Sequence, residues 1–181
     1  ISSKEGYLGV IAIYIINYIN PMDMGALELA AGGKLWLGTS INSTYFGRTL
    51  TPGADNVYRL GGGGNQGNLT IGGGSFENVL TGTASVVIGA QTAGINPNGP
   101  AYINGNFGSV ILTNRNDFSG GLTLNNQAGL AVNNSYALGS GIIYHNGGNL
   151  TLNNSVSIPN EMDMVGDIFS TSGGSNAAIL G

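Results

Sequence analysis

Hydrophobic and polar residues alternate over short pieces along most of the chain. Five such pieces follow one another in the second half, separated mainly by Gly, Asn and Ser. Because alternation with a period of two places side chains on opposite faces of a strand, each piece predicts a short strand. Glycine and asparagine between the pieces suit tight turns, since both adopt positive φ angles. The predicted strands are residues 110–112, 122–124, 130–132, 142–144 and 150–152.

The first half carries the same pattern less regularly. Further strands are predicted at residues 34–37, 57–60, 68–71 and 85–89. Residues 22–31 are also predicted as a strand, because no N-cap is apparent ahead of them and Pro21 fits a strand corner. No segment predicts a helix, so the pattern as a whole indicates an all-β chain.

Residues 8–19 form the most hydrophobic stretch and are apolar on both faces of the predicted strand. A strand with one face in water would alternate with polar residues, so this one is either covered on both sides or forms a contact surface. In the second interpretation it binds a neighbouring copy or module. The candidate self-association surface consists of Val10, Ala12, Tyr14, Ile16 and Tyr18.

Composition narrows the function classes. The chain has 181 residues, of which 41% are hydrophobic and only 8% charged, with a net charge of −4. The 5 basic residues form no cluster, which argues against nucleic-acid binding. The absence of cysteine excludes a disulfide scaffold and thiolate metal sites. No apolar run reaches the roughly 18 residues of a membrane-spanning helix, so no membrane insertion is expected.

The sequence repeats itself at two scales. Strand and turn recur at short intervals, as in solenoid proteins. In addition, residues 20–24 and 160–164 share a Met-Asp-Met triplet, and a Gly-Gly pair follows each. We interpret this as a large unit that begins again near the C-terminal end. The chain starts with Ile1, so we expect a mature piece or a segment of a longer protein.

The segment Arg-Asn-Asp-Phe-Ser-Gly-Gly-Leu-Thr-Leu at 115–124 resembles the core of the autotransporter-associated β-strand repeat, also called the passenger-associated transport repeat. Residues 129–132, 137–141 and 146–150 resemble its continuation. The resemblance is good over 50–152, weaker over 153–181 and weakest over 1–49. It implies a right-handed parallel β-helix that is secreted or displayed on a bacterial surface, without catalytic residues. Its corner residues would be Asn116, Asp117, Gly120, Gly121, Gly139, Gly147 and Gly148.

Candidate catalytic groups are few. Asp117 lies beside Arg115, but an Asp in this context is expected to bond its own backbone at a corner. Glu161 and Asp163 alternate with Met162 and Met164, as on a strand with the acids outward and the methionines inward, and Asp167 is nearby. His145 is expected at the surface or in a turn. The glycine runs lack the Lys of a phosphate loop. We therefore expect no enzyme, no metal site and no cofactor.

Together these features predict one all-β segment over 1–181, a right-handed parallel β-helix of short strands with Gly/Asn corners. We expect an extracellular structural or adhesive module that associates with copies of itself in a fibre, filament or matrix, with surface polysaccharide as a second partner. The alternative is a carbohydrate-binding or polysaccharide-cleaving β-helix, which would need acids, or acids with Lys or Arg, along one groove.

Overall fold

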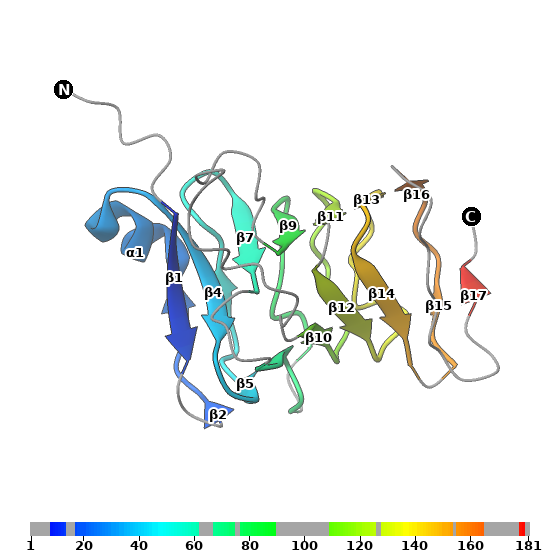
Figure 1. Ribbon diagram of the computed structural model, residues 1–181, viewed down its shortest axis with the longest axis horizontal. Coiled ribbons are helices and arrows are strands. Elements are labelled where there is room, and N and C mark those ends of the chain that lie inside the picture. The colour runs from blue at the N-terminus through cyan, green and yellow to red at the C-terminus, as the bar shows by residue number, and fades with distance from the viewer. Residues whose placement is uncertain are drawn as a thin grey trace.

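A computed structural model describes residues 8–13, 17–61, 67–74, 77–89, 109–125, 128–153, 155–164 and 178–179, and for 8–13 and 178–179 it describes the backbone alone. Figure 1 shows short strands following one another along the long axis of the molecule, from β1 at one end to β16 and β17 at the other. The elements are β1 (Leu8–Ile13), β2 (Asn17–Tyr18), β3 (Met22–Asp23), α1 (Met24–Ala31), β4 (Lys34–Thr39), β5 (Ser43–Tyr45), β6 (Leu50–Thr51), β7 (Val57–Leu60), β8 (Leu69–Ile71), β9 (Ser85–Ile88), β10 (Ser109–Leu112), β11 (Leu122–Leu124), β12 (Gly129–Val132), β13 (Ile143–His145), β14 (Asn149–Leu152), β15 (Ser157–Ile158), β16 (Met162–Met164) and β17 (Ala178–Ile179).

The described strands form two large sheets in which all pairs are parallel. One sheet has the order β1-β4-β7-β9-β11-β13-β16 and the other the order β14-β12-β10-β8-β5-β2. The chain alternates between these sheets, and on a third side it makes the small parallel pairs β3–β6 and β15–β17. We call one passage of the chain through both large sheets a level. The β-rich character predicted from the alternating pattern is therefore confirmed, with parallel sheets as its main feature.

Successive levels match most closely in the second half. Ser109 of β10 pairs with Gly129 of β12, and Gly129 pairs with Asn149 of β14, so the chain returns after 20 residues each time. Exposure alternates along these strands, and the buried positions of both sheets contribute to one hydrophobic core. Rows of like residues run through that core, for example Leu112, Val132 and Leu152. The strands predicted here are confirmed to within one or two residues.

The segment 22–31 is not a strand, and this prediction is wrong. Met22–Asp23 forms the short strand β3, and Met24–Ala31 forms the helix α1. The Asp23 carboxylate caps the helix by accepting a hydrogen bond from the Ala26 amide, and Gly32 ends it at φ 69°. The cap is not apparent in the sequence, because Asp23 lies within the run of alternating residues that predicted a strand. No helix of the described residues is long and apolar enough to cross a membrane.

The two Met-Asp-Met triplets occupy different places. Met22 and Asp23 form β3 on the third side, directly before α1, whereas Met162–Met164 forms β16 in the seven-stranded sheet. Similar sequence therefore does not mean a similar position in the fold at these two sites.

Candidate functional site

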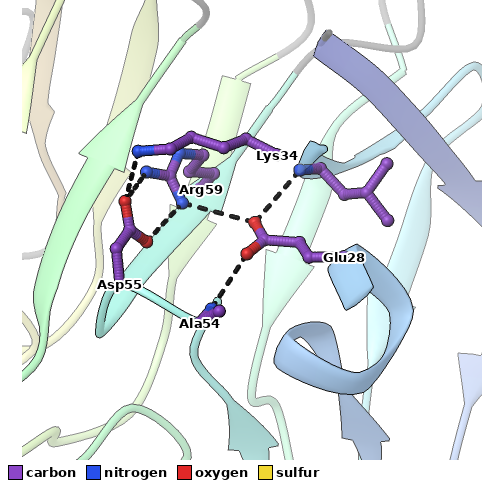
Figure 2. Close-up of polar contacts among 6 residues, drawn as sticks. Glu28, Lys34, Ala54, Asp55 and Arg59 are labelled. Atoms are coloured by element: carbon purple, nitrogen blue, oxygen red, sulfur yellow. Dashed lines mark hydrogen bonds and ion pairs between the residues drawn. The ribbon is translucent and has the colours of Figure 1, made fainter. Parts of the chain in front are cut away.

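All the ion pairs among the described residues lie between α1 and the strands β4 and β7, and Figure 2 shows the side chains that form them. Glu28 points inward from α1, and its Oε1 accepts hydrogen bonds from the Leu35 amide at 3.0 Å and from Arg59 Nη1 at 3.3 Å. Its Oε2 accepts from the Ala54 amide at 2.9 Å. One carboxylate thus joins the helix, the start of β4 and the loop before β7.

Asp55 extends the cluster toward solvent. It accepts hydrogen bonds from both terminal nitrogens of Arg59 and from Lys34 Nζ. The hydrogen bond from Arg59, followed by that from Lys34, holds the pKa of Asp55 well below its usual range despite partial burial. Glu28 and Arg59 are 5% and 9% exposed, whereas the Asp55 and Lys34 side chains are 35% and 56% exposed. Arg59 therefore links a buried carboxylate to a half-exposed ion pair.

This arrangement suits a structural role. Both Glu28 oxygens accept hydrogen bonds from backbone or guanidinium donors, and the side chain is only 5% exposed, so the carboxylate joins neighbouring elements instead of facing solvent. Among the described residues, no group of three or more His, Cys, Asp or Glu side chains is placed to hold a metal ion.

The sequence pattern hides this cluster because it places Glu28 on a predicted strand. Two signals nevertheless point to it. Glu28 is the only charged residue between Asp23 and Lys34, and a lone charge in an apolar run needs a partner if it is buried. Asp55 and Arg59 also stand four residues apart across a turn and a short strand.

The predicted corner residue Asn116 is buried and joins three levels. Its Oδ1 accepts a hydrogen bond from the Leu80 amide at 3.0 Å, and its Nδ2 donates to the Ala137 carbonyl at 2.9 Å. Nδ2 also approaches the Asn114 carbonyl at 3.3 Å. The side-chain amide thus replaces a peptide group where the backbone bends.

Asp117 behaves differently from its neighbour. Its backbone amide donates to the Leu80 carbonyl at 3.2 Å, but its side chain is exposed and forms no hydrogen bond with any residue that the structure describes. The expectation that Asp117 bonds its own backbone is therefore wrong; the side-chain hydrogen bonds at this corner come from Asn116 and run to Leu80 and Ala137.

The predicted corner glycines lie at close backbone contacts between levels. Gly139 has φ +63°, and a Cβ there would lie 2.1 Å from the Phe118 carbonyl oxygen. Gly121 has φ +85°, with the Ile142 carbonyl oxygen 2.8 Å from the same position. Gly120 and Gly148 face the backbone of Ala84 and of Asn125, and Gly147 has φ +89°. Side chains at these positions would push neighbouring levels apart.

The candidate self-association surface is only partly described. Val10 and Ala12 pair in register with Trp36 and Gly38 of β4. Tyr14 and Ile16 lie outside the described residues. Tyr18 faces inward, because its partly buried ring packs against the core and stacks on Tyr45 at 5.7 Å. Burial, the largest cause, raises the pKa of Tyr45 to about 12.

The remaining candidates do not converge. His145 is 1% exposed within β13, so its predicted surface position is wrong; the strand runs one residue further than expected and places Tyr144 outside instead. Glu161 and Asp163 are exposed as predicted, Met162 packs against the core, and Met164 is exposed although the alternation predicted it inside. Asp167 lies outside the described residues.

Comparison with known proteins identifies no relative. No family model matches the chain, and no curated protein or solved structure is similar enough to it to count as a match.

Proposed function

We propose that the chain is a segment of a right-handed parallel β-helix that serves as a structural module outside the bacterial cell. The observation that carries this proposal is the 20-residue return of β10, β12 and β14 to the same sheet in unbroken register. Parallel strands joined by crossovers within one sheet are right-handed in about 98% of cases, which favours that hand here.

The composition supports a scaffold. Backbone hydrogen bonds and amide side chains join successive levels, as between Asn133 and Asn153, whose side chains lie 2.9 Å apart. All three ion pairs among the described residues belong to the cluster at one end, where they join Glu28 to Arg59, and Asp55 to both Arg59 and Lys34. A stack of this kind extends without bringing like charges above one another. The resemblance of 115–124 to the autotransporter-associated repeat supports an extracellular or cell-surface location.

We further propose that the module associates with copies of itself or with neighbouring modules. Within the described part of the chain β1 is an edge strand, and edge strands offer unpaired backbone groups to further strands. Val10 and Ala12 of the candidate self-association surface belong to this strand.

Self-association is tested by analytical ultracentrifugation and electron microscopy of the purified chain over a range of concentrations. We expect assemblies that grow with concentration and that Val10→Asp reduces. Leu29→Lys is the matched control, because Leu29 is 83% exposed and belongs to α1 rather than to the edge strand β1. Dispersed monomers at every concentration contradict self-association, and an equal loss in both variants contradicts the proposed contact. Antibody labelling of intact bacteria that produce the chain in its natural context tests the location.

A further inference from the structure

Three exposed side chains of complementary chemistry lie together on the third side of the molecule. The Arg115 guanidinium lies over the Tyr136 ring, with Cζ 5.8 Å from the ring centroid. Tyr136 is 59% exposed, the most exposed tyrosine among the described side chains. Asp117 lies two residues from Arg115 in the sequence and is exposed, and its carboxylate has no hydrogen-bond partner within the described ranges.

The backbone fixes how these side chains are placed. The Asn116 amide donates to the Tyr136 carbonyl at 3.1 Å, so the segments that carry the three groups are neighbours on successive levels. Asn116 is buried while Arg115 and Asp117 are exposed, so the latter two project to the same side.

We propose that Arg115, Asp117 and Tyr136 form a binding subsite for a neutral hexose unit of a polysaccharide. A guanidinium offers several donors in one plane and a carboxylate offers two acceptors, which together can bind neighbouring hydroxyl groups of a sugar. The part of the exposed Tyr136 ring that the guanidinium does not cover offers an apolar surface to the C–H groups of the same sugar. This inference goes beyond the scaffold role and does not depend on self-association.

The charges favour a neutral sugar over an acidic one. Arg115 and Asp117 carry opposite charges side by side, so the field at the subsite is small, and the chain as a whole carries a net charge of −4. A uronate would gain an ion pair with Arg115 but would face repulsion from Asp117. The contact between Arg115 and Tyr136 also restricts both side chains before binding, which lowers the entropic cost of ordering them.

The subsite is open and small, so binding is expected to be weak. A single sugar unit on such a surface would bind with a dissociation constant on the order of 1 mM. The experiment must therefore detect weak binding to polymers and compare variants under one condition.

Affinity gel electrophoresis of the full chain provides this measurement, with a soluble β-glucan, a mannan, a galactan or polygalacturonate embedded in the gel. We expect one of the neutral polymers to retard the protein, and Tyr136→Ala to weaken that retardation at least fivefold. Arg115→Lys and Asp117→Asn should weaken it severalfold, whereas Tyr136→Phe should retain it because the ring supplies the stacking surface.

Tyr144→Ala is the matched control, since Tyr144 is 41% exposed on β13 in the seven-stranded sheet. Retention of binding in this variant together with loss in Tyr136→Ala supports the subsite. The proposal is overturned by equal loss in both variants, by retardation in polygalacturonate alone, or by no retardation in any polymer. All substituted side chains are exposed, so thermal melting of each variant should match the parent chain.

Discussion

Successive levels are joined by different side chains near α1 and in the region from β10 to β15. In the first region the chain returns from Ser43 to Leu69 after 26 residues, a helix interrupts the strands, and charged side chains join the elements. In the second region it returns after 20 residues, and asparagine amides and glycines occupy the corners.

The difference follows from the backbone groups that each region leaves unpaired. Where levels match, the amide of one level meets a carbonyl of the next, and an amide side chain such as that of Asn116 fills the remaining gap. Where α1 intervenes, the buried Leu35 amide and the part-buried Ala54 amide need an acceptor, and the Glu28 carboxylate supplies it. A buried carboxylate then requires a cation, which Arg59 provides.

Removal of Glu28 should have the largest effect. Glu28→Ala leaves Arg59 buried without this partner and the Leu35 amide without an acceptor, so we expect a loss of about 3–5 kcal/mol in the free energy of unfolding. Asp23→Ala is the control for the helix itself, because it removes only the N-cap and should cost about 1 kcal/mol. Urea denaturation measures both. Equal losses would mean that the cluster adds nothing beyond holding α1.

Substitution of Gly139 tests the second region. Gly139→Ala brings a Cβ to 2.1 Å from the Phe118 carbonyl oxygen at φ +63°, so the neighbouring level must move, and we expect a loss of about 2–4 kcal/mol. Gly82 also has a positive φ, +77°, but nothing lies within 4 Å of the position that a Cβ would take there. Gly82→Ala should therefore cost only about 1 kcal/mol. If thermal melting shows the two variants to be equally stable, close contact between levels does not limit this corner.

Asn116 and Asp117 provide a comparison within one corner. Asn116→Ala removes the side chain that serves the Leu80 amide and the Ala137 carbonyl, and each buried group left unpaired costs about 1–3 kcal/mol. Asp117→Ala removes an exposed side chain and should change stability by less than about 0.5 kcal/mol. Chemical denaturation of the two variants side by side measures the contrast. A larger loss from Asp117→Ala would reverse the roles of the two side chains.

The strands of the region from β10 to β15 could be predicted from the sequence, because the alternation of hydrophobic and polar residues is regular there. Alternation over β10, β11, β12 and β14 defines both the strand and its buried face, and Gly or Asn marks each turn. The sequence could not show that Asn116 rather than Asp117 holds the corner, since both residues favour turns. Burial decides between them, and burial depends on the levels above and below.

The first region is predicted less well because its signals conflict. Residues 22–31 alternate as in a strand and also carry a helix cap at Asp23, and the helix forms because it places Met24 in the core and Glu28 beside Arg59. That partner is 31 residues away in sequence. The exposed face of α1, with Leu29 83% exposed, gives none of the usual amphipathic pattern.

Acidification should affect the two regions differently, although the effect is the smallest of the four. The folded-state pKa of Asp55 lies below its unfolded value of about 3.9, so its contribution is present above that pH and disappears as the pH falls further. Asp55 is 35% exposed, and solvent screening limits this contribution to about 1 kcal/mol or less. The difference in unfolding free energy between the parent chain and Asp55→Asn should therefore be constant from pH 7 to about pH 5 and shrink below about pH 4.

Hydrogen exchange at low pH should show the loss of protection at β4 and β7, with β10, β12 and β14 unchanged, because only the first region depends on ion pairs among the described residues. A gap that widens on acidification, or equal loss of protection in both regions, would contradict this division.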